Sequence, residues 1–102
     1  MLWAVMCIDN PNTHEAREKL LKVHREYLAT QESSIFFSGP LQTDDATASL
    51  GSLFIMNVRS RSEAQAFVDA EPFYRAGIFA HVNIYRMRKG RYNPPVLDMA
   101  LT

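Results

Sequence analysis

The sequence contains little that would tie the chain to a membrane, an oxidising compartment or a polyanion. Its one cysteine, Cys7, cannot form an internal disulfide, and its five methionines would be oxidised outside the cell, so we expect a reducing bacterial cytoplasm. Eleven basic residues balance eleven acidic ones, which excludes the positive field of a general nucleic-acid binder. No apolar run approaches the roughly 20 residues that cross a bilayer, and the N-terminus lacks the basic region of a signal peptide.

The short motifs of metal and nucleotide sites are also missing from the sequence. It has no HxxxH or CxxC spacing, no glycine-rich phosphate loop after a strand and no GxSxG elbow. We therefore expect neither a metal nor a cofactor. Cys7 lies inside a predicted strand with no base near it in sequence, which favours a buried, inert thiol over a nucleophile.

What the sequence does contain is the pattern of one α+β domain, since 102 residues allow a single core. Hydrophobic periodicity predicts a β-α-β-β-α-β order, the split βαβ pattern, in which two helices cover one face of a four-stranded antiparallel sheet. Thr13 should cap the first helix, and Ser60 with Glu63 matches the capping box of the second. The predicted strands span residues 2–8, 33–41, 50–58 and 79–87, and the helices 13–31 and 60–70, with one further turn at 73–77.

The first and third predicted strands are apolar on both faces, as in Trp3 and Leu2 or Ile55 and Phe54. Helices can cover only one of these faces, so we expect a second copy of the chain to cover the other, which would form a dimeric α+β barrel. The sequence does not decide whether such dimers assemble into higher oligomers. Residues 1–90 form the expected domain, and residues 91–102 a C-terminal tail or an arm that packs on the partner.

Two ionisable residues break the pattern of the first helix. On a helical wheel, Arg17 and His24 fall within the apolar stripe that faces the sheet, whereas Arg25 falls with the other charged residues on the solvated side. His24 could be a core histidine bonded to a backbone carbonyl, with Arg17 extending past the sheet edge. Alternatively, the stripe borders a cleft in which His24 exchanges protons and Arg17 binds an anion.

Topology supports a cleft, because segments that are far apart in sequence should meet at one end of the sheet. Each of these residues also has a structural interpretation as a turn, a strand end or a solvated loop. The side chains and turns expected at this end are Asp9, Arg17, Gly39, Pro40, Asp44, Asp45 and Glu71.

In their order and spacing, several short segments resemble the YciI family. They are MLWAVMCIDNP at residues 1–11, Arg17 seven positions before His24, SGPL at 38–41, Asp44-Asp45, Gly51-Ser52 and EPFYRAGIF at 71–79. The resemblance implies a ferredoxin-like, dimeric α+β barrel with a His-Asp dyad, carried here by His24 and Asp9. Arg17 would bind an anionic substrate.

Two features complicate this assignment. His24 lies about 15 Å along the helix, at 1.5 Å per residue, so Asp9 meets it only if the connecting loop folds back. Asp44 and Glu71 are the alternative partners. Many family members also have Asp-Pro-Tyr where this chain has Glu71-Pro72-Phe73, so the carboxylate is displaced by one methylene and the phenol is missing.

Three hypotheses about function follow. The first is a cofactor-independent enzyme in which His24 and Asp9 perform elimination or isomerisation on a small organic acid, aromatic acids included, that contacts Arg17, Gly39, Pro40, Asp44 and Glu71. The second is a non-catalytic ligand-binding or accessory protein that uses the same cleft. The third is an interaction module that docks another protein through its dimer faces and basic tail.

Overall fold

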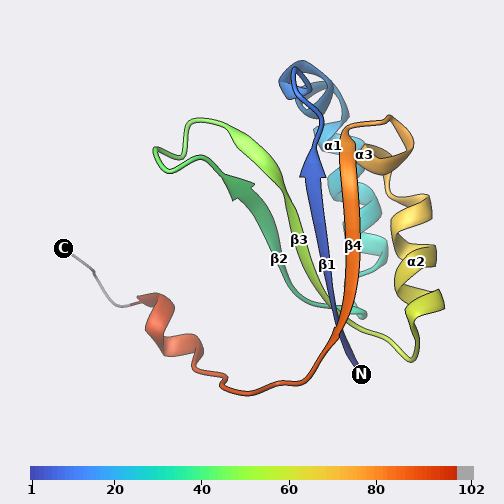
Figure 1. Ribbon diagram of the computed structural model, residues 1–102, viewed down its shortest axis with the longest axis vertical. Helices are drawn as coiled ribbons and strands as arrows, with labels where there is room; N and C mark the ends of the chain where they lie inside the picture. Colours follow the sequence, from blue (N-terminus) through green and yellow to red (C-terminus); the bar gives the residue numbers. More distant parts are fainter. Residues whose placement is uncertain (99–102) are drawn as a thin grey trace.

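The fold is a four-stranded antiparallel sheet with helices on one face, seen in a computed structural model that describes residues 1–98 (Figure 1). The predicted β-α-β-β-α-β order is confirmed, and the turn expected after Pro72 is a short third helix. Residues 99–102, the end of the predicted tail, lie outside the described range. The elements are β1 (Leu2–Asp9), α1 (His14–Thr30), β2 (Ile35–Gln42), β3 (Ser49–Asn57), α2 (Arg61–Ala70), α3 (Pro72–Arg75), β4 (Phe79–Met87) and the 3-10 helix η1 (Pro94–Asp98).

The sheet has the order β2-β3-β1-β4, so β1 is central and β2 lies at an edge. Along β1, Val5 pairs with Phe54 of β3 on one side and with Ile84 of β4 on the other. Gly51 is needed in this packing, because a Cβ there would collide with the carbonyl oxygen of Cys7. The Gly51-Ser52 pair therefore reflects the close approach of β3 to β1.

The core lies between the sheet and the helices. Alternate residues of β1 point into it, and α2 adds an apolar face on the opposite side. A helix that presents apolar residues on one face gains stability when that face is packed against a sheet. The buried core residues are Trp3, Val5, Cys7, Phe54, Met56, Ala64, Phe67, Val68, Phe73, Ile78, Phe79 and Ile84.

The two long helices begin differently. Ser60 caps α2 as predicted, since its hydroxyl accepts the backbone N–H of Glu63 at 3.2 Å. The Glu63 carboxylate accepts the backbone N–H of Arg59 at 2.9 Å, whereas a capping box would use the N–H of Ser60. Thr13 is the N-cap residue of α1 as predicted, but it makes no side-chain capping hydrogen bond, because its hydroxyl donates to the carbonyl of Asn10 at 2.9 Å.

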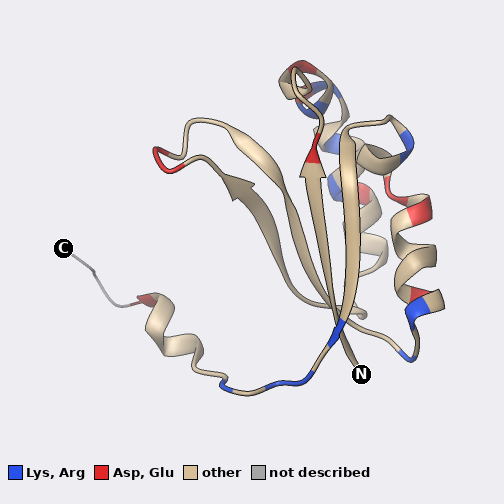
Figure 2. Cartoon of the chain, viewed as in Figure 1, with Lys and Arg blue, Asp and Glu red and all other residues tan. Residues whose placement is uncertain are grey.

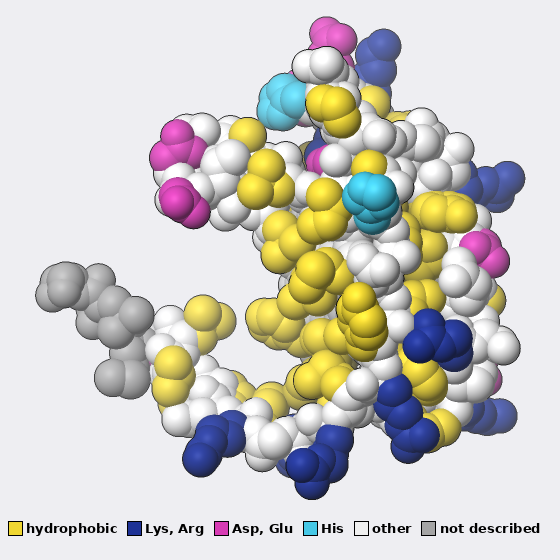
Figure 3. All heavy atoms as spheres, in the orientation of Figure 1, with side chains coloured by type: hydrophobic (Ala, Val, Ile, Leu, Met, Phe, Trp, Pro, Cys, Tyr) yellow, Lys and Arg dark blue, Asp and Glu magenta, His cyan; other side chains and the backbone are white. Residues whose placement is uncertain are grey.

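The other face of the sheet is uncovered by helices and strongly apolar (Figure 3). Met6, Ile8, Phe37 and Tyr85 are among its exposed large side chains. After β4 the chain leaves the sheet and forms η1, whose residues line a hollow together with strand residues of the uncovered face. The Leu97 side chain is 84% exposed. Such a large apolar surface indicates contact with something other than water.

Charges of both signs are spread over the helices, with Lys and Arg following the end of β4 into the C-terminal segment (Figure 2). Asp44 and Asp45 lie at the tip of the β2–β3 loop, the acidic tip in the same view. No helix among residues 1–98 is both long and apolar enough to span a membrane.

Candidate active site

A cleft of about 420 Å³ lies between α1 and the neighbouring strands β2 and β3. One wall is α1, the other is the helix-facing side of the two strands, and α3 closes the cleft with the ring of Phe73. Its size is within the range of pockets that hold small organic ligands. The lining residues are Arg17, Leu21, His24, Arg25, Leu28, Ser38, Gly39, Pro40, Ser49, Ser52, Phe54 and Phe73.

His24 is held in this cleft by a buried carboxylate. Its Nδ1 lies 2.5 Å from Oε1 of Glu71, and the two residues are only 9% and 1% exposed. Oε2 of Glu71 accepts the backbone N–H groups of Phe73 at 3.1 Å and Tyr74 at 3.2 Å, so the same carboxylate caps α3. These contacts fix the position of the carboxylate before any ligand binds.

The hydrogen bond to Glu71 also determines which imidazole nitrogen can react. A carboxylate accepts only, so Nδ1 must carry the proton whether the ring is neutral or charged. Nε2 remains to exchange a proton with a molecule in the cleft. The ring is held further by stacking on Phe73, with centroids 4.0 Å apart and an interplanar angle of 7°.

Arg17 and Asp9 form a second buried pair. Nε and Nη2 of Arg17 donate to the two carboxylate oxygens of Asp9 at 2.6 and 2.9 Å, and the side chains are 11% and 6% exposed. Nη2 also donates to the hydroxyl of Ser52 at 3.1 Å. The guanidinium carbon lies 4.8 Å from the centroid of Phe73, the ring on which His24 stacks. Asp9 thus offsets the charge of Arg17.

The expected contact between His24 and Asp9 is not formed. Asp9 ends β1 beside the first turns of α1 and meets Arg17, whereas α3 brings Glu71 to His24 two turns further along the helix. The distance along α1 thus separates Asp9 from His24, and the alternative partner Glu71 forms the hydrogen bond to His24.

The remaining predicted site residues are divided between the cleft and the solvent. Gly39 and Pro40 line the cleft. Asp44 is exposed in the β2–β3 loop and is not among the lining residues. Its neighbour Asp45 serves the loop itself: hydrogen bonds from the Thr43 and Thr47 side chains lower its pKa to about 2.

Cys7 has the inert character expected of it. Burial, followed by the nearby carboxylates of Glu71 and Asp9, raises the pKa of the thiol to about 12, against the opposing effect of Arg17. A thiol that stays protonated at neutral pH is a poor nucleophile. Within residues 1–98, no three His, Cys, Asp or Glu side chains are grouped so that they could hold a metal ion.

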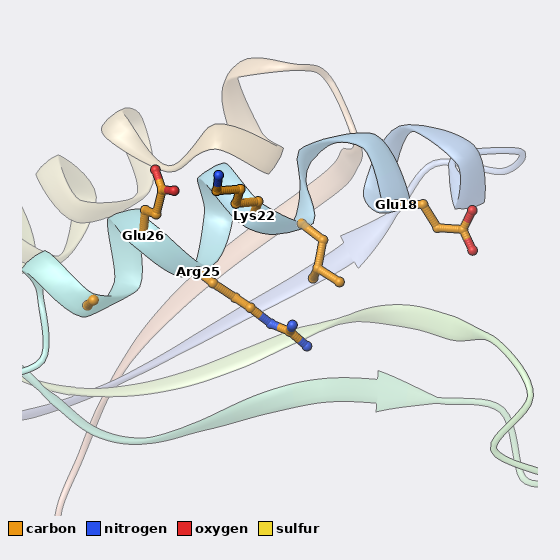
Figure 4. A pocket seen from close by; sticks show the side chains of 6 residues that line it. Glu18, Lys22, Arg25 and Glu26 are labelled. Atoms are coloured by element: carbon orange, nitrogen blue, oxygen red, sulfur yellow. The ribbon is translucent and has the colours of Figure 1, made fainter.

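Arg25 was missed by the helical wheel, which placed it on the solvated side. Its side chain leaves α1 toward the strands and lines the cleft (Figure 4). Leu21 and Leu28, four residues before it and three after it, also line the cleft. This spacing could have revealed its position, because residues three and four apart share a helix face. Ser52 and Phe73, which lie outside α1 and also line the cleft, were not predicted as site residues from the sequence.

The hollow drawn in Figure 4 is a different feature that runs along α1 and shares Leu21 and Arg25 with the cleft. Its volume is about 540 Å³, but every residue that lines it belongs to this one helix. It has no second wall and is a groove between exposed side chains.

We expect Asp9→Asn to destabilise the protein by about 3 kcal/mol, because it leaves the buried guanidinium of Arg17 without a counter-charge. The measurement is urea denaturation at neutral pH. Asp44→Asn removes the same charge from an exposed loop and should stay within about 0.5 kcal/mol of the wild type. Equal midpoints for the two variants would contradict a structural role for the Asp9–Arg17 pair.

Comparisons with known proteins agree with this architecture. Two relatives named Protein YciI, from Escherichia coli O6:H1 and Shigella flexneri, are each 29% identical to the chain over 96 residues, covering 87% of this chain and 98% of theirs. The chain is also similar to a solved structure, with a TM-score of 0.81. That protein is 5-chloro-2-hydroxyhydroquinone dehydrochlorinase (TftG) from Burkholderia phenoliruptrix AC1100, in complex with 2,5-dihydroxybenzoquinone. It is 30% identical in sequence, and the match covers 88% of this chain and 96% of that one.

The family itself is identified by a sequence profile. The YCII-related domain matches residues 1–88, which include the His24–Glu71 and Arg17–Asp9 pairs, all four strands and every residue that lines the cleft. The resemblance drawn from the short motifs is confirmed, and the chain belongs to the YCII-related domain family.

Proposed function

We propose that this protein is a cofactor-independent acid–base enzyme that performs elimination or isomerisation on a small, ring-shaped organic molecule in the α1–β2–β3 cleft. The observation that carries the proposal is the buried hydrogen bond between His24 and Glu71 at the wall of that cleft. A histidine with one nitrogen fixed on a carboxylate and the other beside a ligand-sized space has the arrangement of a general base.

The proposed step needs only proton transfer. Nε2 of His24 takes a proton from the substrate, the electron pair of that bond forms a new double bond, and a leaving group such as chloride departs with its own bonding pair. The imidazolium produced is stabilised by the Glu71 carboxylate at Nδ1 and then releases its proton to water. In an isomerisation, it would return the proton to another atom of the substrate.

The shape and chemistry of the cleft support a flat ring as the substrate. Phe54, Phe73 and Pro40 supply apolar surface, while Ser38 and Ser49 supply hydroxyl groups that can bond to ring oxygens. The similar protein TftG is named as a dehydrochlorinase of a chlorinated hydroxyhydroquinone and was solved with a dihydroxybenzoquinone. We therefore propose hydroxylated aromatic rings as the first class to test.

The geometry changes the proposed roles at the site: Glu71, in place of Asp9, is the proposed carboxylate partner of His24. Gly39 and Pro40 keep their proposed contact with the substrate. Arg17 can reach a substrate only through Nη1, because Nε and Nη2 are engaged by Asp9 and Ser52. Asp44 loses its proposed role, since it lies outside the cleft.

The direct test is a turnover screen with halogenated di- and trihydroxybenzenes, followed by ultraviolet absorbance and chloride release. With an active substrate, His24→Ala should lower kcat by about 10²- to 10⁴-fold, the usual contribution of a general base. Glu71→Gln should also reduce kcat, because it removes the charge that stabilises the imidazolium. His14→Ala, which alters an exposed histidine on the same helix, is the control and should retain the wild-type rate.

Full activity in His24→Ala would refute the mechanism. Specific binding of these rings without any turnover would instead favour the ligand-binding alternative for the same cleft.

We also propose that the protein is a homodimer in which a second copy covers the outer face of the sheet. The exposed Met6, Ile8, Phe37 and Tyr85 form the apolar surface that supports this arrangement. A reducing cytoplasm remains our prediction for its location, and the buried free thiol of Cys7 is compatible with it.

Light scattering after size-exclusion chromatography should give twice the mass of the chain. Met6→Lys places a charge in the middle of the apolar face and should shift the protein toward monomers. Val23→Lys, at an exposed apolar residue of α1, is the matched control. A wild-type protein that is monomeric at micromolar concentration would contradict the dimer.

A further inference from the structure

The charges around the cleft are nearly all compensated. Arg17 is paired with Asp9, and His24 is hydrogen-bonded to Glu71. Arg25 is the third basic side chain that lines the cleft, and no carboxylate within residues 1–98 forms an ion pair with it. Its positive charge is therefore available to a ligand.

The direction of the Arg25 side chain supports this assignment. In Figure 4 it extends from α1 toward the strands, whereas the neighbouring Lys22 and Glu26 point away from them and Glu18 lies further along the helix. Arg25 is exposed, so no burial cost opposes its charge. Glu18 and Glu26 share the shallow groove along α1 with Arg25, but neither of them lines the cleft.

The facing wall would accept a negative group. No Asp or Glu is among the residues that line the cleft, and the carboxylates behind its wall, Asp9 and Glu71, are each hydrogen-bonded to a basic side chain. Ser38 and Ser49 add neutral hydroxyl donors on the strand side. A guanidinium facing hydroxyl groups across a space lined with aromatic and aliphatic carbon matches a ring that carries an ionised oxygen.

We propose that Arg25 is the specificity-determining residue of this cleft and selects rings that carry an anionic oxygen over neutral rings of the same size. The inference rests on the proposed function, since it assigns a substrate class to the same site. It gives Arg25 the anion-binding role that the sequence suggested for Arg17. The Arg17 guanidinium is hydrogen-bonded to Asp9 and Ser52 and contacts the ring of Phe73.

The experiment compares two ligands of similar size by isothermal titration at neutral pH and low salt. 2,5-Dihydroxybenzoquinone is an anion under these conditions, because each hydroxyl group is conjugated to a carbonyl as in a carboxylic acid. Hydroquinone is neutral. The wild type should bind the anion more tightly, and Arg25→Gln should weaken anion binding about tenfold or more, the typical value of a charge-assisted hydrogen bond. Hydroquinone binding should change by less than about twofold.

Two further variants make the result specific. Lys22→Gln removes the same charge from the same helix, one turn earlier and outside the cleft, and should bind both ligands like the wild type. Arg25→Lys keeps the charge but loses the planar pair of donors, so its affinity for the anion should be intermediate. Thermal melting of each variant checks that the fold is intact.

The outcomes separate this inference from the proposed function. If the wild type binds the anion and Arg25→Gln binds it equally well, or if Lys22→Gln loses as much affinity, the inference is wrong while the acid–base mechanism stands. If the wild type prefers the neutral ring, the inference is also wrong. If it binds neither ring in the cleft, both the inference and the proposed aromatic substrate class are refuted.

Discussion

The carboxylate of Glu71 is the group on which the rest of the site depends. It is nearly inaccessible to solvent, and such a buried charge is tolerated only when donors surround it. Here the donors are two backbone N–H groups at the start of α3 and one nitrogen of His24. The same contacts begin the helix, place Phe73 against the imidazole and select the nitrogen that faces the cleft. One side chain therefore links local helix formation to the chemistry of the site.

Phe73 connects the two buried pairs, His24–Glu71 and Arg17–Asp9. Its ring stacks on His24 and also lies under the guanidinium of Arg17, so a shift of α3 would disturb both. The Asp9–Arg17 pair joins the end of β1 to α1 and, through Ser52, to β3. We infer a division of roles in which one pair fixes the frame of the cleft and the other provides its reactive nitrogen. In this division Arg25 provides the positive charge for a ligand, because Arg17 and His24 are each bonded to a carboxylate.

The sequence predicted the elements well because each depends on local patterns. The continuous apolar run at residues 2–8 defines β1. The inward position of Arg17 and His24 follows from helical periodicity alone. The partner of His24 could not be predicted in the same way. It depends on where α3 docks after α2, 47 residues from the histidine in sequence, and no local pattern encodes that contact. Arg25 was missed because a wheel records the direction of Cβ, whereas a long side chain at the edge of the stripe can reach the cleft.

The central claim is that Glu71 holds the proton of His24 on Nδ1 and leaves Nε2 for the cleft. Long-range ¹H–¹⁵N correlation spectra of the protein with ¹⁵N-labelled histidine, recorded where the imidazoles are neutral, report the tautomer of each ring. The account predicts that His24 is almost entirely the Nδ1–H tautomer, in contrast to the exposed His14 and His81. A His24 ring protonated on Nε2, or averaged between tautomers like the exposed rings, would contradict it.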